Sequence, residues 1–145
     1  MKLKTLNLKT FAIAAVLLCA PSLAFAHAAK IGEHGGPQTD AGSFHVEVVT
    51  KDAKVDVYLH DHALKAVTSA GFKGVAIFKA ADGKPVRIPL EPAGDNKLSG
   101  DAPSPLPAQI EGAVQITTQT GSTVQGKFAA HDQDNEHQAE HLHDH

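Results

Sequence analysis

Four histidines stand near carboxylate residues in the first half of the chain, within 30 positions of one another. Imidazole nitrogen and carboxylate oxygen together are ligands for Zn(II), Cu(II), Ni(II) or Co(II). The sequence therefore predicts an ordered site for a divalent transition metal. The candidate ligands are His34, His45, Glu47, His60, Asp61 and His62.

Two short segments, FHVEVV and KVDVYLH, alternate apolar and polar residues as half-buried strands do. The turn at residues 50–54 sets a register that keeps both apolar faces in the core. That register pairs Val46 with Leu59 and puts His45 opposite His60 on the outer face. Directly opposed side chains have Cβ atoms about 5 Å apart, so two imidazoles there can share one ion.

The other candidate ligands lie near this pair. Glu47 shares the outer face with His45, and Asp61 and His62 follow the second strand directly. His34 precedes the hairpin, next to Gly35–Gly36, where the absence of side chains lets the backbone approach a site closely. We expect these groups to converge at one end of the hairpin.

A simpler alternative is that each histidine is a polar surface residue. A register shifted by two positions would put Tyr58 or His62 opposite His45 instead of His60. The gathering of several imidazoles at one hairpin end favours the metal site over this alternative.

The last 15 residues, HDQDNEHQAEHLHDH, contain five of the ten histidines. Because this segment has almost no apolar residues, we expect residues 131–145 to be disordered. Such imidazoles bind divalent cations weakly, which suits metal buffering, and acid should release the ions because neutral imidazole is the ligand. A solubilising tail is the alternative. The candidate ligands here are His137, His141, His143 and His145.

The first 26 residues have the pattern of a secretory signal peptide. Three lysines precede an apolar run over residues 11–20, and Ala24-Phe25-Ala26 matches a cleavage site. The run is shorter than the roughly 20 residues that span a bilayer. We expect export to the periplasm and no membrane anchor after cleavage, and we consider lipid attachment at Cys19 the minority alternative.

Cleavage after Ala26 would make His27 the new N-terminus. An N-terminal amine and its imidazole can chelate Cu(II) together with another histidine, so a mononuclear copper enzyme is a third hypothesis. The alternative is a frayed end that carries a histidine by chance.

Composition excludes several function classes. Removing the three signal lysines leaves ten basic residues against sixteen acidic ones, a formal net charge of −6 with histidine neutral. An acidic chain does not suit nucleic acid. The single cysteine and single methionine leave with the signal, so soft sulfur ligands are absent. Because no nucleophile, nucleotide-binding or metalloprotease motif is present, we expect no enzymatic activity.

The fold expected is all-β, a small antiparallel β-sandwich, immunoglobulin-like or barrel-like, with about six or seven strands and a disordered histidine-rich tail. From Phe44 onward, apolar and polar residues alternate in short segments that are separated by turn residues. This pattern supports the expected fold. The expected divisions are a signal peptide at 1–26, an extended segment at 27–37, the β-sandwich domain at 38–130 and the tail at 131–145.

Several segments also resemble a group of small exported proteins associated with heavy-metal efflux systems of the bacterial periplasm. The segments are GGPQTDAGSFHVEVV, VDVYLHDH, GFKGVAIF, RIPLEPAGDNKLSGDAPSPLPAQIEGAVQIT and VQGKF, within about residues 34–129. The resemblance supports His45, Glu47, Asp61 and His62 with the Gly35–Gly36 turn. It does not extend to His60 or to the tail, and it shifts weight toward His45 with His62.

Together these features predict a periplasmic, non-enzymatic protein that buffers or delivers a divalent transition metal, with an efflux component as a possible partner. The alternative is an interaction module that docks on an efflux or envelope partner through a sheet edge, with histidines that form no ordered site.

Overall fold

The computed structural model describes residues 30–130, which form nine β-strands and, within that range, no helix. Neighbouring strands all pair antiparallel. The expectation of an all-β antiparallel fold is confirmed. The strands are β1 (Lys30–Ile31), β2 (Pro37–Ala41), β3 (Phe44–Lys51), β4 (Lys54–His60), β5 (Lys73–Lys79), β6 (Pro85–Pro92), β7 (Lys97–Asp101), β8 (Gly112–Thr117) and β9 (Thr123–Phe128).

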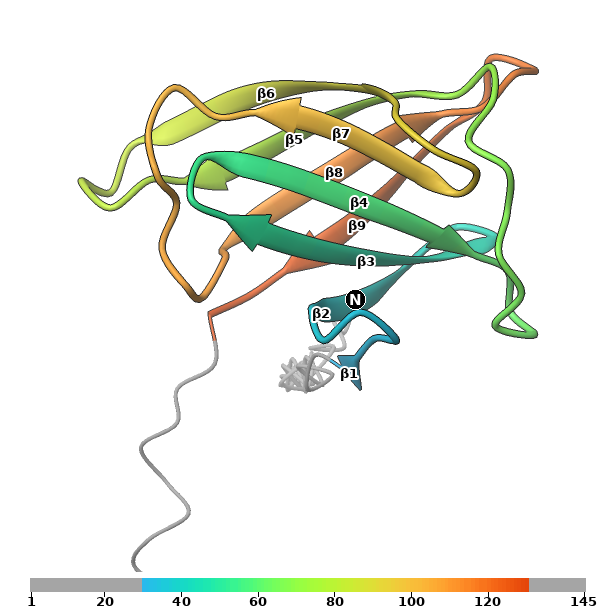
Figure 1. Ribbon diagram of the computed structural model, residues 1–145, viewed down its shortest axis with the longest axis horizontal. Helices are drawn as coiled ribbons and strands as arrows, with labels where there is room; N and C mark the ends of the chain where they lie inside the picture. The colour runs from blue at the N-terminus through green and yellow to red at the C-terminus, as the bar shows by residue number, and fades with distance from the viewer. Residues whose placement is uncertain (1–29, 131–145) are drawn as a thin grey trace, which may run out of the picture.

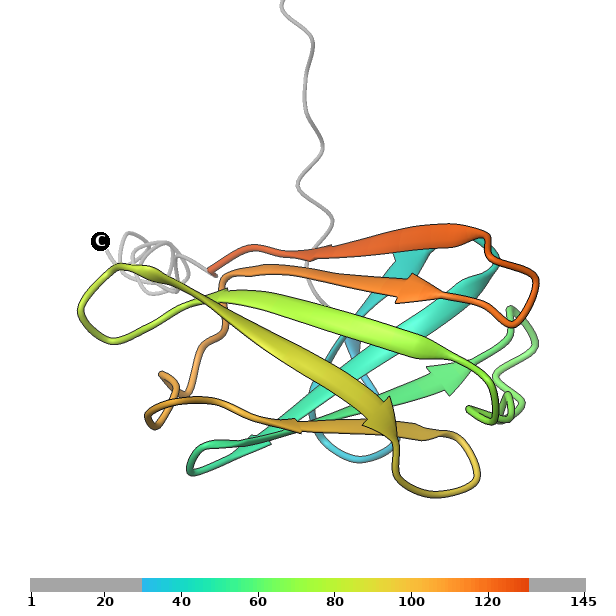
Figure 2. The ribbon, with the colours of Figure 1, turned by 90° about the horizontal axis from the view of Figure 1, so that it is seen from above.

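The strands form one sheet in the order β1-β2-β3-β4-β7-β6-β5-β8-β9, curled into a half-barrel (Figures 1 and 2). β6 pairs with β5 along most of its length, but it meets β7 only through Glu91 and Pro92. The curl brings β9 next to β2, where a Cβ on Gly126 would lie 2.8 Å from Thr39 Cγ2. β2 and β9, which lie near opposite ends of the strand order, are therefore neighbours in space.

The hairpin β3–β4 has the predicted register. Val46 pairs with Leu59, and His45 pairs with His60. The strands are joined by Asp52 and Ala53, and Asp52 has a φ of 55°, a left-handed conformation that aspartate tolerates in turns. The alternation of apolar residues thus located the histidine pair correctly.

The core lies on the concave side of the curled sheet. The alternating valines of β3 and β4 pack there with side chains from the other strands, and nearly all are fully buried. Aliphatic residues supply most of this core, in keeping with the low aromatic content. The largest fully buried apolar side chains are Phe78, Leu59, Ile88, Leu90, Leu98 and Ile116.

The structure has nine strands where the sequence predicts six or seven. The two additional strands, β1 and β2, have the sequences KI and PQTDA, which lack an alternating apolar pattern. β2 forms because the edge of β3 offers free backbone groups for pairing, and β1 pairs in turn with β2. The segment at 27–37, expected only to be extended, therefore contributes to the sheet.

In the described range there is no helix of the length and hydropathy that a membrane crossing requires. The signal peptide expected at 1–26, His27 and the tail expected at 131–145 lie outside the described residues.

Candidate metal-binding face

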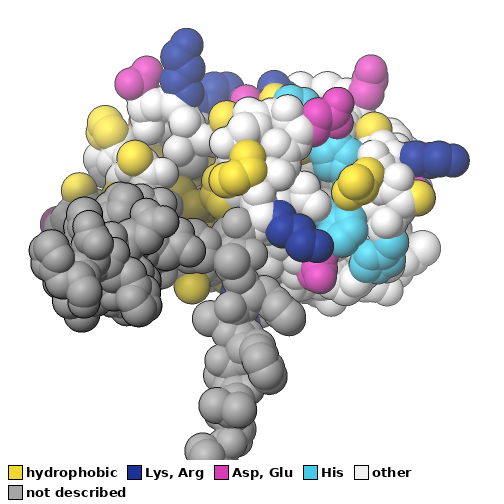
Figure 3. Space-filling view, turned by 90° about the horizontal axis from the view of Figure 1, so that it is seen from below, with side chains coloured by type: hydrophobic (Ala, Val, Ile, Leu, Met, Phe, Trp, Pro, Cys, Tyr) yellow, Lys and Arg dark blue, Asp and Glu magenta, His cyan; other side chains and the backbone are white. Residues whose placement is uncertain are grey.

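His34, His45, His60 and His62 lie near one end of the β3–β4 hairpin, and we call the surface around them the histidine face. Figure 3 shows histidine side chains gathered on one side of the molecule. Alternation along β3 and β4 turns His45 and His60 away from the apolar core. The loop between β1 and β2 carries His34, and the segment after β4 carries His62.

His45 is held in place by a carboxylate from the neighbouring strand. Asp40 of β2 pairs directly with His45, and its Oδ1 lies 2.6 Å from His45 Nδ1. The His62 ring approaches His45 edge-on, with centroids 5.0 Å apart and ring planes at 90°. His45 is therefore oriented from one side by Asp40 and contacted from another by a second imidazole.

His34 is held by Glu47, the only carboxylate among residues 30–130 that is fully buried. Glu47 Oε1 accepts hydrogen bonds from the backbone N–H groups of His34, at 2.7 Å, and Gly36, at 3.0 Å. Glu47 Oε2 lies 3.0 Å from His34 Nδ1. Burial of a carboxylate is costly unless it is paired, and these three contacts supply the partners.

Two glycines let the β1–β2 loop lie this close to β3. A Cβ on Gly32 would be 2.3 Å from Glu47 Cδ, and one on Gly36 would be 2.1 Å from the carbonyl oxygen of Val48. Neither position has space for a side chain. Glu47 thus anchors the loop that presents His34, which is a positioning role.

The His34 ring also stacks on Tyr58 of β4. The ring centroids are 3.6 Å apart and the planes are inclined by 9°. The centroids of His34 and His60 are 6.2 Å apart. Stacking and the contact with Glu47 together fix the orientation of His34.

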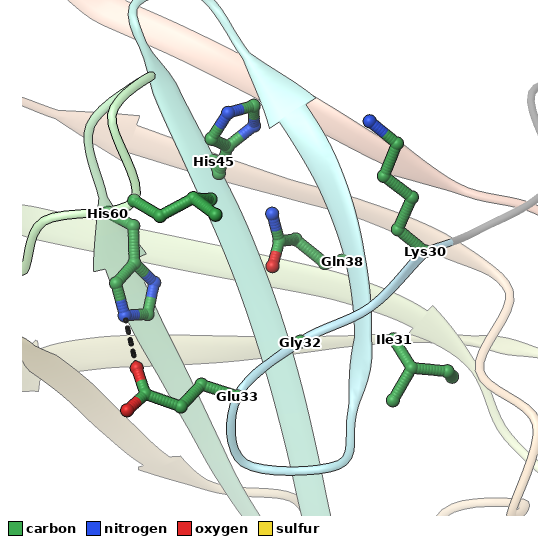
Figure 4. Close-up of a pocket in the computed structure, with 8 residues that line it drawn as sticks. Lys30, Ile31, Gly32, Glu33, Gln38, His45 and His60 are labelled. Atoms are coloured by element: carbon green, nitrogen blue, oxygen red, sulfur yellow. Dashed lines mark ion pairs between the residues drawn. The ribbon is translucent and has the colours of Figure 1, made fainter.

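His60 is nearly fully buried, and its Nδ1 has no hydrogen-bond partner among residues 30–130. Its Nε2 lies 3.6 Å from Glu33 Oε2, as drawn in Figure 4. Buried polar atoms in proteins nearly always have a partner, so an unpaired imidazole nitrogen needs an explanation. It is the one orphaned buried side-chain atom found in the described part of the chain.

An open pocket of about 450 Å³ lies over His45 and His60. Figure 4 shows the two histidines on one side of it and the β1 segment on the other. The other residues that line it include charged, polar and apolar side chains. The lining residues are Lys30, Ile31, Gly32, Glu33, Gln38, His45, His60 and Leu64.

Asp61 organises the turn that follows β4. Its Oδ1 accepts hydrogen bonds from the backbone N–H groups of Ala63, at 2.8 Å, and Lys65, at 2.9 Å. The hydrogen bond from Lys65 is the largest cause that holds the pKa of Asp61 below its ordinary value of 3.8. Like Glu47, this carboxylate stabilises a loop beside the histidines.

The arrangement can donate imidazole nitrogen to an ion. A neutral histidine whose Nδ1–H donates a hydrogen bond to a carboxylate has its free lone pair on Nε2, which is how metal-binding histidines are commonly held. Two imidazoles on one ion have ring centroids about 5–6 Å apart when the ion–nitrogen bonds are about 2 Å. The separations of 5.0 Å for His45 and His62 and 6.2 Å for His34 and His60 are comparable.

Within residues 30–130, however, no three histidine, cysteine, aspartate or glutamate side chains converge on one point as a complete metal site requires. The face offers pairs of imidazoles. The tail candidates His137, His141, His143 and His145 lie outside the described residues.

Sequence reasoning missed Asp40 and Glu33. Asp40 was missed because β2 was not predicted as a strand, although Gly42, with a φ of 61°, marks the turn that pairs Asp40 with His45. Glu33 gives no local signal, since its approach to His60 depends on how the β1–β2 loop folds over the sheet.

No protein-family model, curated protein or solved structure matches this chain. The resemblance to exported efflux-associated proteins stays a prediction.

Proposed function

We propose that this protein is a non-enzymatic, periplasmic binding protein for a divalent transition metal, which buffers or delivers the ion in heavy-metal homeostasis or efflux. The observation that carries the proposal is the set of imidazoles on the histidine face. Two of them have Nδ1 against a carboxylate, and a third has a buried nitrogen that has no partner among residues 30–130.

The ligands that we favour are His45 and His60, which are paired residues on β3 and β4 and line the same pocket. His62 and His34 are the next candidates, because their rings lie 5.0 Å from His45 and 6.2 Å from His60 respectively. We assign Glu47 a positioning role, since both of its oxygens already have partners. Asp61 is assigned the same role, because it caps the 61–65 turn.

The proposal includes export by the signal peptide at 1–26 and a disordered tail at 131–145 that collects ions. It also groups the fold with β-sandwiches. This grouping is supported by the way the two halves of the curled sheet face each other across the core (Figure 2).

Calorimetric titration with Zn(II), Ni(II), Co(II) and Cu(II) tests the function. Three proteins that begin at His27 are compared. They are the unchanged chain, a pocket variant with His45→Ala and His60→Ala, and a tail variant in which the five histidines after Ala130 are alanine. We expect the tail variant to retain one bound ion and the pocket variant to lose that ion. Far-ultraviolet circular dichroism shows whether each variant keeps its sheet.

The control is Asp101→Asn, which removes an exposed carboxylate at the end of β7 whose one ion-pair partner within the described residues is Lys54. It should bind as the unchanged protein does. Identical titrations for the unchanged protein and the folded pocket variant would contradict an ordered site and confine metal binding to the tail.

The second candidate, an interaction module, is favoured by two exposed hydrophobic residues. Ile31 and Leu64 are 71% and 64% exposed, and both line the pocket. β1 stands at the edge of the sheet beside them, where a partner strand can pair. Capture of an envelope partner that is abolished by Leu64→Asp and unchanged by chelator would favour this candidate over the metal-binding one.

A further inference from the structure

Two hydrophobic side chains stand in water beside the same pocket. Ile31 is 71% exposed and Leu64 is 64% exposed, and no other large hydrophobic residue in the described part of the chain is exposed. Both line the open pocket of about 450 Å³ over His45 and His60. A single exposed hydrophobic residue is common on protein surfaces, but two that share one concavity form a surface suited to contact with another molecule.

The fold holds Leu64 in an unfavourable backbone conformation. Its φ is 60°, in the left-handed region that glycine and asparagine adopt readily and that is costly for a bulky side chain. Hydrogen bonds fix the turn: Leu64 N–H donates to the carbonyl oxygen of Asp61 at 3.0 Å, and Asp61 Oδ1 accepts from the N–H groups of Ala63 and Lys65. Leucine suits neither this turn nor the solvent, so its presence indicates a contact made with another molecule.

An exposed leucine and an open pocket lie on the same face of the molecule. Figure 3 shows hydrophobic side chains beside the histidines on this side, together with charged groups of both signs. A second copy of the chain presents the same leucine and the same pocket. A two-fold axis through this face therefore places Leu64 of each copy over the pocket of the other, and every contact is made twice.

The charges around the pocket are also complementary to those of a second copy. Lys30 and Glu33 lie on either side of the pair Ile31–Gly32 in the sequence, and both line the pocket (Figure 4). Lys30 is exposed, and the Glu33 side chain is 78% exposed, so both charges are open to a partner. A face that carries one charge of each sign can meet its own copy with Lys30 near Glu33, whereas a face of a single sign repels its copy. We call Lys30, Ile31, Glu33 and Leu64 the pocket rim.

We propose that the pocket rim is the interface of a symmetric homodimer. Leu64 of each copy packs on Ile31 and the pocket of the other copy, and Lys30 of each copy pairs with the partner's Glu33. β1, which stands at the edge of the sheet, lies within this interface. The inference goes beyond the proposed function, because the contacts that form the dimer involve no metal ion.

Leu64→Asn separates the interface from the fold, because asparagine adopts a positive φ readily and is polar. Sedimentation equilibrium of the chain from His27, with chelator present, measures the dimer. We expect Leu64→Asn to weaken dimerisation about tenfold or more. Urea unfolding at a concentration where the unchanged chain is monomeric should show equal or greater stability for the variant. Ala81→Asn, at an exposed position in the β5–β6 turn, is the matched control and should dimerise as the unchanged chain does.

A charge exchange tests the pairing of Lys30 with the partner's Glu33. Lys30→Glu and Glu33→Lys each place like charges opposite one another twice, so each alone should weaken dimerisation about fivefold at low salt. The double variant Lys30→Glu/Glu33→Lys restores opposite charges and should recover the dimer. Lys84→Glu is the matched control, since it changes the net charge as Lys30→Glu does at an exposed lysine between β5 and β6. It should leave the dimer unchanged.

The outcomes separate this inference from the proposed function. A chain that stays monomeric at every concentration in chelator overturns the dimer and leaves the metal function standing. A dimer that Leu64→Asn does not weaken uses another surface, which also overturns the inference. A double exchange that is weaker than both single changes overturns the pairing of Lys30 with Glu33. Absence of Zn(II) binding by a chain that dimerises as expected contradicts the metal function alone.

Discussion

At the scale of single residues, the histidine face is defined by what holds each imidazole. His45 and His34 contact carboxylates through Nδ1, at 2.6 Å and 3.0 Å, and this leaves Nε2 to bind an ion. His60 lacks a partner at Nδ1 among residues 30–130. A bound ion would give an imidazole nitrogen a partner, so the positions of these three histidines agree with metal binding. They do not by themselves form a complete metal site.

Asp40→Asn should weaken Zn(II) binding by about tenfold, because the carboxylate that orients His45 becomes an amide that is a poorer acceptor. Calorimetric titration measures the change. Asp101→Asn is the matched control, since Asp101 is as exposed as Asp40 and also pairs with one basic side chain. Equal affinities for both variants would show that Asp40 does not support a ligand.

Glu47→Gln should lower the free energy of unfolding by about 1–3 kcal/mol, because one oxygen of a fully buried carboxylate becomes an N–H donor that faces His34. Urea unfolding followed by circular dichroism measures this. Glu111→Gln removes a carboxylate that is half exposed and pairs with Lys79, so its effect should be small. A Glu47→Gln variant as stable as Glu111→Gln would refute the anchoring role.

At the scale of elements, sequence reasoning reproduced the strands from β3 to β9 and missed β1 and β2. The alternating valines of β3 and β4 fixed which residues face the core, and this determined the pairing of His45 with His60. β2 was missed because PQTDA carries no apolar alternation; its pairing depends on the free edge of β3. The burial of Glu47 was missed for the same reason, since the β1–β2 loop covers it only after β2 has paired.

The turn at Asp61–Lys65 should loosen in acid. The pKa of Asp61 is lowered, chiefly by the hydrogen bond from Lys65, so the ionised form stabilises the turn. This contribution is fully present above the ordinary value of 3.8 and is lost as the pH falls through the lower, folded-state pKa. Carboxyl chemical shifts against pH should give a midpoint below 3.8 for Asp61, together with movement of the Lys65 amide; a midpoint at or above 3.8 would contradict the cap.

At the scale of the whole molecule, the curl of the sheet places the strand that carries Asp40 beside the last strand of the described chain, β9. β2 carries Asp40 and Gln38 at the histidine face, and β9 runs beside β2. No local pattern in the sequence predicts this neighbourhood, because it depends on how far a nine-stranded sheet curls.

The central claim is that His45 and His60 bind a divalent metal, and the most direct measurement is the ring nitrogen spectrum of the histidines during a Zn(II) titration. The account predicts that one equivalent of Zn(II) shifts a ring nitrogen of His45 and one of His60 to the range of metal-bound imidazole, together and in slow exchange. If the rings of His45 and His60 keep their positions while Zn(II) is taken up elsewhere, the claim is contradicted.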